Sequence, residues 1–204
     1  MKVLIVYSHP SSTKSYTSEV LRQLEESLHK QNIAYEISDL YKMNFQSDMT
    51  EAEYEREGLV KKELPIPEDV RREQEKIEAA DCIIFLYPVW WSDCPAKLKG
   101  WFDRVYSVGY AYGYNEADPT ERQHSMTQLK YGLVICTAGH PTEFLDEIGI
   151  SHSMRNIMLD DRLGKRFAKK EMLILGGTID LEKVKHRHTI AIVDIGEKVL
   201  ANCS

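Results

Sequence analysis

A short aromatic stretch near the middle of the chain carries the residues best suited to hold a ligand. From Phe85 to Tyr114 lie 10 of the chain's 19 aromatic side chains, around a loop with Trp90 and Trp91 at its centre. Rings gathered beside the end of a strand hold a flat molecule by stacking, although helix packing or a subunit interface also gathers them. The pattern predicts a site for a flat ligand, with packing as the alternative.

A second loop, from Ser8 to Ser15, is rich in hydroxyl groups and lies between an apolar run and an amphipathic segment. Unpaired N–H groups and partial positive charge at a helix N-terminus suit a phosphate, and hydroxyl groups add donors. The same residues would also cap the helix with no ligand present, so both readings stay open. We expect His9 to donate a hydrogen bond to a phosphate or sugar-alcohol chain. His186 and His188 have no third ligand nearby, so we expect no metal.

Composition narrows the class of protein and of partner. With 204 residues, 43% apolar and 28% charged, the chain is expected to be one globular domain over residues 1–204. Its net charge of −6 argues against nucleic acid as a partner. No apolar run is long enough to insert in a membrane, and the four cysteines form no CxxC pair. The apolar run at the start is short and no small-residue cleavage pattern follows it, so we expect no signal peptide. We expect a cytoplasmic protein.

The elements that must position these loops alternate between strands and helices. Apolar runs predict strands over residues 2–7, 34–40, 82–87, 131–137 and 171–175. Helical spacing predicts helices over residues 15–30, 68–80, from Pro95 onward, 143–169 in pieces broken near Gly149 and Gly164, and 181–201. The long charged excursion over residues 41–67 is expected to contain one or two helical turns.

This order predicts an α/β, flavodoxin-like three-layer sandwich with a five-stranded parallel sheet in the order 2-1-3-4-5. Ligands of such sheets bind beyond the carboxyl ends of the strands, which here means the loops over residues 8–14, 88–94 and 138–142. Receiver domains share the topology, but they need acidic residues after the first strand and at the end of the third. The chain has Tyr7-Ser8-His9 and Tyr87-Pro88 there, which excludes that class.

Together the loops resemble those of flavin-dependent NAD(P)H:quinone oxidoreductases of the DT-diaphorase type. The similarity covers most of the chain and is most specific from Pro95 to Arg104, behind the tryptophan loop. It also includes residues 39–45, 87–106, 110–114 and 137–139.

The resemblance implies a set of cofactor and substrate residues. The cofactor phosphates would be bound by His9, Ser15, Tyr16 and Thr17. The isoalloxazine ring would be lined by Pro88, Val89, Trp90, Trp91 and Ser92, and its pyrimidine edge by Thr137, Ala138, Gly139 and His140. The substrate pocket would be completed by Phe144 and, from the other subunit of a homodimer, by Tyr112 and Tyr114. The family's proton-relay positions fall on Leu145 and Ser151, so the catalytic candidates are only Ser151 and its neighbour His152.

The function implied is two-electron, ping-pong transfer from NAD(P)H to a quinone or similar flat acceptor. The stretch over residues 39–45 resembles the FAD-using branch and leads into the excursion that would cover an adenine, so FAD is expected, with FMN as the alternative. An azoreductase or nitroreductase-like flavoenzyme is the nearest alternative function. A non-catalytic regulatory flavin-binding subunit and a flavodoxin-type electron carrier are the alternatives of other classes.

Overall fold

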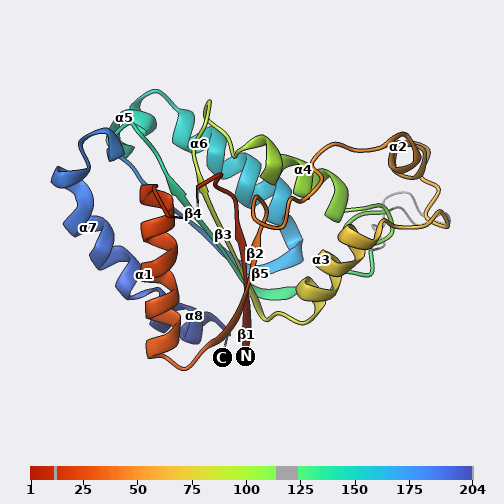
Figure 1. Ribbon diagram of the computed structural model, residues 1–204, viewed down its shortest axis with the longest axis horizontal. Coiled ribbons are helices and arrows are strands. Elements are labelled where there is room, and N and C mark those ends of the chain that lie inside the picture. The colour runs from red at the N-terminus through yellow and green to blue at the C-terminus, as the bar shows by residue number, and fades with distance from the viewer. Residues whose placement is uncertain (12, 114–123, 204) are drawn as a thin grey trace.

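The computed structural model describes residues 1–11, 13–113 and 124–203, and in this part of the chain five parallel strands form one sheet between two layers of helices (Figure 1). The strands are β1 (Lys2–Tyr7), β2 (Ala34–Asp39), β3 (Cys82–Pro88), β4 (Leu129–Thr137) and β5 (Phe167–Leu175). Their order in the sheet is β2-β1-β3-β4-β5. The flavodoxin-like architecture predicted from the sequence is therefore confirmed.

The central strands are apolar throughout because both of their faces are covered. Every residue of β3 is buried, and so are residues 3–7 of β1. Successive side chains of a strand point to opposite faces. Leu4 therefore packs with one core cluster, under α3 and α4, while Val3 and Ile5 pack with the other, under α1 and α8. The register pairs Pro88 with Thr137 and Thr137 with Leu175, which aligns the carboxyl ends of the strands at one edge.

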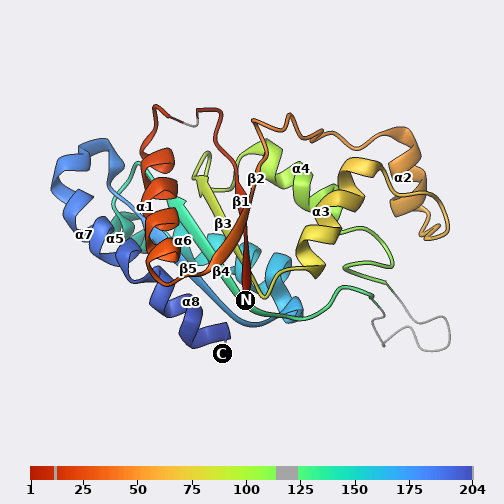
Figure 2. The same cartoon turned by 60° about the horizontal axis from the view of Figure 1, so that its bottom comes forward.

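Helices cover both faces of the sheet (Figures 1 and 2). On one face lie α1 (Tyr16–Lys30), α7 (Leu181–Val193) and α8 (Ile195–Cys203), and on the other α3 (Glu68–Glu78), α4 (Ala96–Val105) and α6 (Ile150–Arg155). The remaining helical segments are α2 (Glu51–Gly58), α5 (Thr142–Glu147), the π-helical η1 (Asn156–Leu163), and the 3₁₀ turns η2 (Gly164–Arg166) and η3 (Thr178–Asp180). None of the helices in the described ranges is long and apolar enough to cross a membrane.

Two expected elements differ from the structure for identifiable reasons. The last helix, expected to be continuous over residues 181–201, is divided at Asp194. The Ser27 hydroxyl donates to the Val193 carbonyl oxygen at 2.6 Å and accepts the Gly196 N–H at 2.9 Å, so a side chain from α1 replaces the helix's own hydrogen bonds there. The fifth strand starts at Phe167, earlier than expected, because it pairs with β4 along its whole length.

The excursion over residues 41–67 packs against α4. The buried guanidinium of Arg104 donates to Glu53 at 2.6 Å, to the Gln46 carbonyl oxygen at 2.6 Å, and to both oxygens of Asp69. Gly100 lets the chain come close, since a Cβ atom there would lie 2.2 Å from the Ser47 carbonyl oxygen. The excursion is thus held on the face opposite α1, and it contains the expected short helix, α2.

Candidate functional site

The loop after β1 presents polar groups at the carboxyl edge of the sheet. Ser8 is fully buried, and its hydroxyl has no hydrogen-bond partner among the described residues. The Nδ1 atom of His9 lies 2.9 Å from both the amide nitrogen and the carbonyl oxygen of Ser11. The loop's own backbone therefore engages Nδ1, which leaves Nε2 as the ring nitrogen to meet a ligand.

The start of α1 is capped by its own hydroxyl groups. Ser15 is the N-cap, its Oγ accepts the Ser18 N–H at 3.0 Å, and the Ser18 hydroxyl donates to the Ser15 carbonyl oxygen at 2.7 Å. The capping role left open for these residues is confirmed for Ser15. Capping does not use the N–H groups of Tyr16 and Thr17, the first two residues of the helix, and these amides suit a phosphate oxygen.

The hydroxyl groups of Tyr16 and Thr17 already make hydrogen bonds within the protein. The Thr17 hydroxyl lies 2.8 Å from that of Thr137, a buried contact that joins α1 to the end of β4. The Tyr16 hydroxyl lies 3.0 Å from Nδ1 of His188 on α7, and burial, followed by the charge of Glu19, raises the pKa of Tyr16 to about 12. Their proposed cofactor contacts are therefore through backbone N–H groups. His188 packs against Tyr16, a role that its sequence spacing did not indicate.

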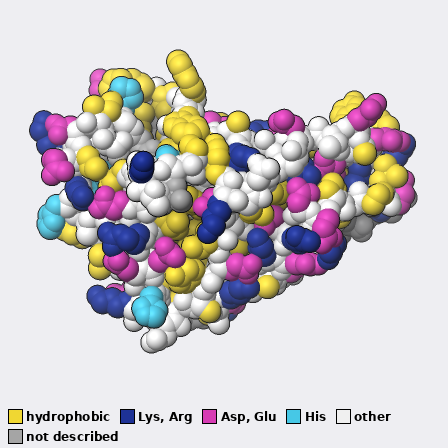
Figure 3. Space-filling view, viewed as in Figure 1, with side chains coloured by type: hydrophobic (Ala, Val, Ile, Leu, Met, Phe, Trp, Pro, Cys, Tyr) yellow, Lys and Arg dark blue, Asp and Glu magenta, His cyan; other side chains and the backbone are white. Residues whose placement is uncertain are grey.

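The loop after β3 is a two-residue hairpin that displays a tryptophan. Trp90 and Asp93 exchange backbone hydrogen bonds of 2.9 and 3.2 Å, and between them Trp91 and Ser92 have φ angles of 48° and 65°. Two positive φ angles are the pattern of a type I′ turn, which bulky side chains rarely adopt. Trp91 is 101% exposed and Trp90 42%. Hydrophobic side chains protrude at this edge of the molecule (Figure 3), where a flat ligand would cover them.

An arginine from η1 holds this hairpin. Arg162, itself buried, donates to both carboxylate oxygens of Asp93 at 2.9 and 3.0 Å. Burial alone would raise the pKa of Asp93, but the hydrogen bonds and charge of Arg162 outweigh it and lower that pKa. Arg162 was not among the predicted site residues, because only the fold brings it to the loop, 69 positions away along the chain.

The loop after β4 is fixed through its carbonyl groups. Those of Ala138, Gly139 and His140 accept N–H groups of residues 177–179 at 2.8–3.3 Å. These bonds leave the N–H groups of Gly139 and His140 for a ligand. A Cβ atom on Gly139 would meet only Ile179 within 4 Å, so the space beside it is otherwise open. The His140 and Phe144 rings lie 5.0 Å apart, which brings a predicted cofactor residue next to a predicted substrate residue.

The two catalytic candidates make contacts within the helices that follow. Ser151 is buried and its hydroxyl donates to Asp146, at the junction of α5 and α6. His152 is exposed, and its Nε2 lies 3.2 Å from the side-chain amide of Asn156. Among the hydrogen bonds of the described residues, none joins either side chain to the three loops. Their catalytic role stays a prediction.

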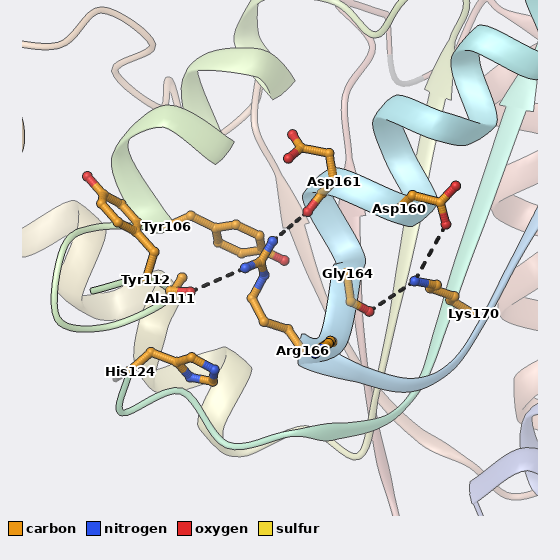
Figure 4. Close-up of a pocket in the computed structure, with 10 residues that line it drawn as sticks. Tyr106, Ala111, Tyr112, His124, Asp160, Asp161, Gly164, Arg166 and Lys170 are labelled. Carbon is orange, nitrogen blue, oxygen red and sulfur yellow. Dashed lines mark hydrogen bonds and ion pairs between the residues drawn. The ribbon is translucent and has the colours of Figure 1, made fainter. Parts of the chain in front are cut away.

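Tyr112 lies far from the loops of its own chain. Its hydroxyl donates to Glu57 of α2 at 2.9 Å, and it lines a cavity of about 1020 Å³ (Figure 4). Across that cavity the Arg166 guanidinium stacks on the Tyr106 ring at 5.0 Å and donates to the Ala111 carbonyl oxygen. Arg166 immediately precedes β5, a strand of 9 residues that spans about 30 Å. The three loops follow the carboxyl ends of the strands, so this cavity lies at the opposite end of the sheet from them. Tyr114, paired with Tyr112 in the prediction, lies outside the described residues.

The loops bring together backbone and imidazole donors, exposed aromatic rings and an orphaned buried hydroxyl. No thiol in them is poised as a nucleophile, since burial, reinforced by Asp93 against the charge of Arg162, raises the pKa of Cys94 to about 12. Such a donor set fits a flat aromatic cofactor with a phosphate tail. The cofactor, rather than a side chain, would then carry the chemistry.

Comparison with known proteins gives consistent results. The model of a family described by its flavodoxin-like fold matches residues 1–164. An uncharacterized NAD(P)H oxidoreductase of Haemophilus influenzae is 31% identical over 164 residues, which cover 78% of this chain and 75% of that protein. An NAD(P)H:quinone oxidoreductase from Methanothermobacter marburgensis has a structure with a TM-score of 0.89 and 43% identity, over 96% of this chain and 97% of that one. An FMN-dependent NADH-azoreductase from Bacillus anthracis, solved with FMN, shares the fold with a TM-score of 0.71 and 19% identity, over 97% and 98% of the two chains.

Proposed function

We infer that this chain is a flavin-dependent NAD(P)H:quinone oxidoreductase. It belongs to the family described by its flavodoxin-like fold. The structural observation that best supports this function is that Trp91 is fully exposed in a strained turn at the carboxyl edge of the sheet. A ring in that position gains by stacking on a second flat molecule. The likeness to the Methanothermobacter marburgensis enzyme over nearly the whole chain supports the same conclusion.

The flavin, when bound, supplies two-electron transfer between NAD(P)H and the acceptor. The protein's part is to bind and orient it. The N–H groups of Tyr16 and Thr17 and the Nε2 atom of His9 would bind its phosphates. The hairpin with Trp90 and Trp91 would line its ring, together with Pro88, Val89 and Ser92. The N–H groups of Gly139 and His140 would donate to the polar edge of the ring, where negative charge gathers on reduction.

We propose FAD as the cofactor and keep FMN as the alternative. A cavity of about 730 Å³ lies beside the first turns of α1 and is lined by Thr13, Ser15, Tyr16 and Leu181 among others. It would give room for a nucleotide beyond the phosphate site. The excursion expected to cover the adenine packs against α4 through Glu53 and Gln46. The fold-level relative from Bacillus anthracis, solved with FMN, is the reason to keep the alternative.

We further propose that the protein acts as a homodimer of single-domain chains in the cytoplasm. Tyr112 is 37% exposed, next to a cavity at the other end of the sheet from its own loops. In a dimer it would meet the partner's loops and, with Tyr114, complete the wall against which nicotinamide and quinone alternate. Phe144, beside His140, would line the same pocket from the flavin's own subunit.

The test combines cofactor identity with turnover. The visible spectrum of the purified protein and the mass of the compound released by heat identify the flavin. NADH and NADPH oxidation is then followed with a soluble quinone, with an azo dye, and with no acceptor. We expect one FAD per chain and turnover that depends on the quinone. Faster turnover with the azo dye would support the azoreductase alternative. Bound flavin with no turnover would support a regulatory subunit or carrier, and no flavin after incubation with either form would refute the proposal.

A further inference from the structure

The buried side chain of Arg162 contacts several groups at once. Besides the two hydrogen bonds to Asp93, its guanidinium lies 3.3 Å from the Cys94 sulfur and 3.1 Å from the Met158 sulfur. Its Cζ atom lies 5.2 Å from the centre of the Phe102 ring on α4. It therefore connects η1, α4 and the base of the tryptophan hairpin at one point.

Besides Arg162, the hairpin is held by the two backbone hydrogen bonds between Trp90 and Asp93, and the Trp90 ring lies 6.1 Å from that of His9. Its tip is exposed, and both tip residues have the positive φ angles that non-glycine side chains avoid. Asp93 closes the turn and also accepts the Cys94 N–H at 2.7 Å, on the same oxygen that receives one Arg162 hydrogen bond. The shape of the turn thus depends on where the Asp93 carboxylate is placed, and a two-pronged guanidinium fixes a carboxylate in position and in orientation.

We propose that Arg162 is a positioning residue that acts through Asp93 to hold the Trp90–Asp93 hairpin in the conformation that receives the flavin. The inference rests on the proposed function only in taking the flavin as the hairpin's ligand. The π-helical form of η1, which carries Arg162, fits the frequent occurrence of such segments at functional sites. Arg162 pre-organises the ring-binding wall without touching the cofactor.

The experiment compares the double variant Asp93→Asn with Arg162→Met against the wild type. Changing both residues avoids leaving a buried charge without its partner, and an apolar replacement of such a pair is often tolerated. Amide hydrogen exchange in the flavin-free protein reports on the hairpin directly. We expect faster exchange over residues 89–94 and unchanged exchange in β3. The flavin dissociation constant, from fluorescence titration, should rise about tenfold, which converts to about 1.4 kcal/mol.

The single variant Arg162→Lys provides a graded test. It keeps the charge but not the two-pronged geometry, so flavin affinity should fall between the wild type and the double variant. The matched control is Arg104→Met with Asp69→Asn and Glu53→Gln, because Arg104 also donates to the buried carboxylate of Glu53. Arg104 is also a buried arginine bonded to both oxygens of an aspartate, but it joins α4 to α3 through Asp69 and to the excursion through Glu53, and within the described residues it does not contact the hairpin. The control should leave exchange over residues 89–94 and flavin affinity unchanged.

Two results would overturn the inference. One is unchanged exchange in the hairpin of the double variant. The other is a loss of flavin affinity in the control as large as in the double variant, since the effect would then be one of general stability. If the wild type binds no flavin, the proposed function fails, but exchange in the flavin-free protein still decides whether Arg162 holds the hairpin.

Discussion

Replacing Trp91 by glycine is expected to make the flavin-free protein more stable and the flavin complex weaker. The Trp91 side chain is 101% exposed, so its removal loses no buried surface in the folded chain. Its φ of 48° costs a non-glycine residue about 1–2 kcal/mol, which glycine avoids. Glycine also gives the unfolded chain more conformational freedom, which lowers the stability of the folded protein by about 0.4–1 kcal/mol. The balance is a gain between about 0 and 1.6 kcal/mol in the free energy of unfolding, centred on about 0.8 kcal/mol.

The measurement is urea unfolding of flavin-free protein, followed by circular dichroism. Trp91→Ala is the control, because it removes the same ring but keeps a Cβ atom in the strained position. It should be less stable than Trp91→Gly by about 1 kcal/mol. Both variants should bind flavin less tightly by about 0.5–1.5 kcal/mol, the usual contribution of an aromatic pair.

A glycine variant less stable than the wild type would refute this reasoning. It would mean that the ring is buried in solution, for example against a second copy of the chain. Repeating the melts over a range of protein concentrations separates these cases, because the stability of a dimer depends on concentration and that of an isolated chain does not.

Three further predictions follow from individual contacts. Tyr112→Ala should lower quinone turnover and leave flavin content unchanged, as steady-state rates and the visible spectrum will test; loss of flavin would place the ring in the cofactor's own wall. Gly100→Ala should destabilise the protein by about 1–3 kcal/mol in urea melts, despite the better helix propensity of alanine, because its Cβ would meet the Ser47 backbone at 2.2 Å. Asp93→Asn should lower the pKa of Cys94 from about 12, because it removes the negative charge that opposes the thiolate and keeps the positive charge of Arg162 that favours it. An unchanged pH titration of thiolate absorbance would contradict this.

The sequence predicted the sheet well because burial on both faces leaves a clear pattern. The limits of β1 agree with the expectation. The expected helix break near Gly149 is also present, and Gly149 has a φ of 76° there. The break at Asp194 was missed because its cause, the Ser27 hydroxyl, comes from a different helix. The periodicity of residues within one helix does not indicate a contact with a side chain from another helix.

The sequence indicated which loops follow the aligned strand ends, but not which contacts their side chains make. Hydroxyl groups near a helix start indicated a phosphate site, yet Ser15 caps the helix and Thr17 bonds to Thr137, so the donors that we propose are backbone groups. Arg162 was missed altogether, because its effect on the hairpin passes through Asp93 and depends on η1 lying beside the end of β3.

The hydroxyl pair of Thr17 and Thr137 has a consequence for how this site can evolve. The two hydroxyl oxygens are buried and lie 2.8 Å apart, although the residues are 120 positions apart in the sequence. Losing one hydroxyl leaves the other unsatisfied, at a cost of about 1–3 kcal/mol, whereas exchanging both for apolar groups of similar shape is nearly neutral. Substitution at these positions is therefore expected to be correlated among descendants of a common ancestor, so that lineages carry two hydroxyl groups or none.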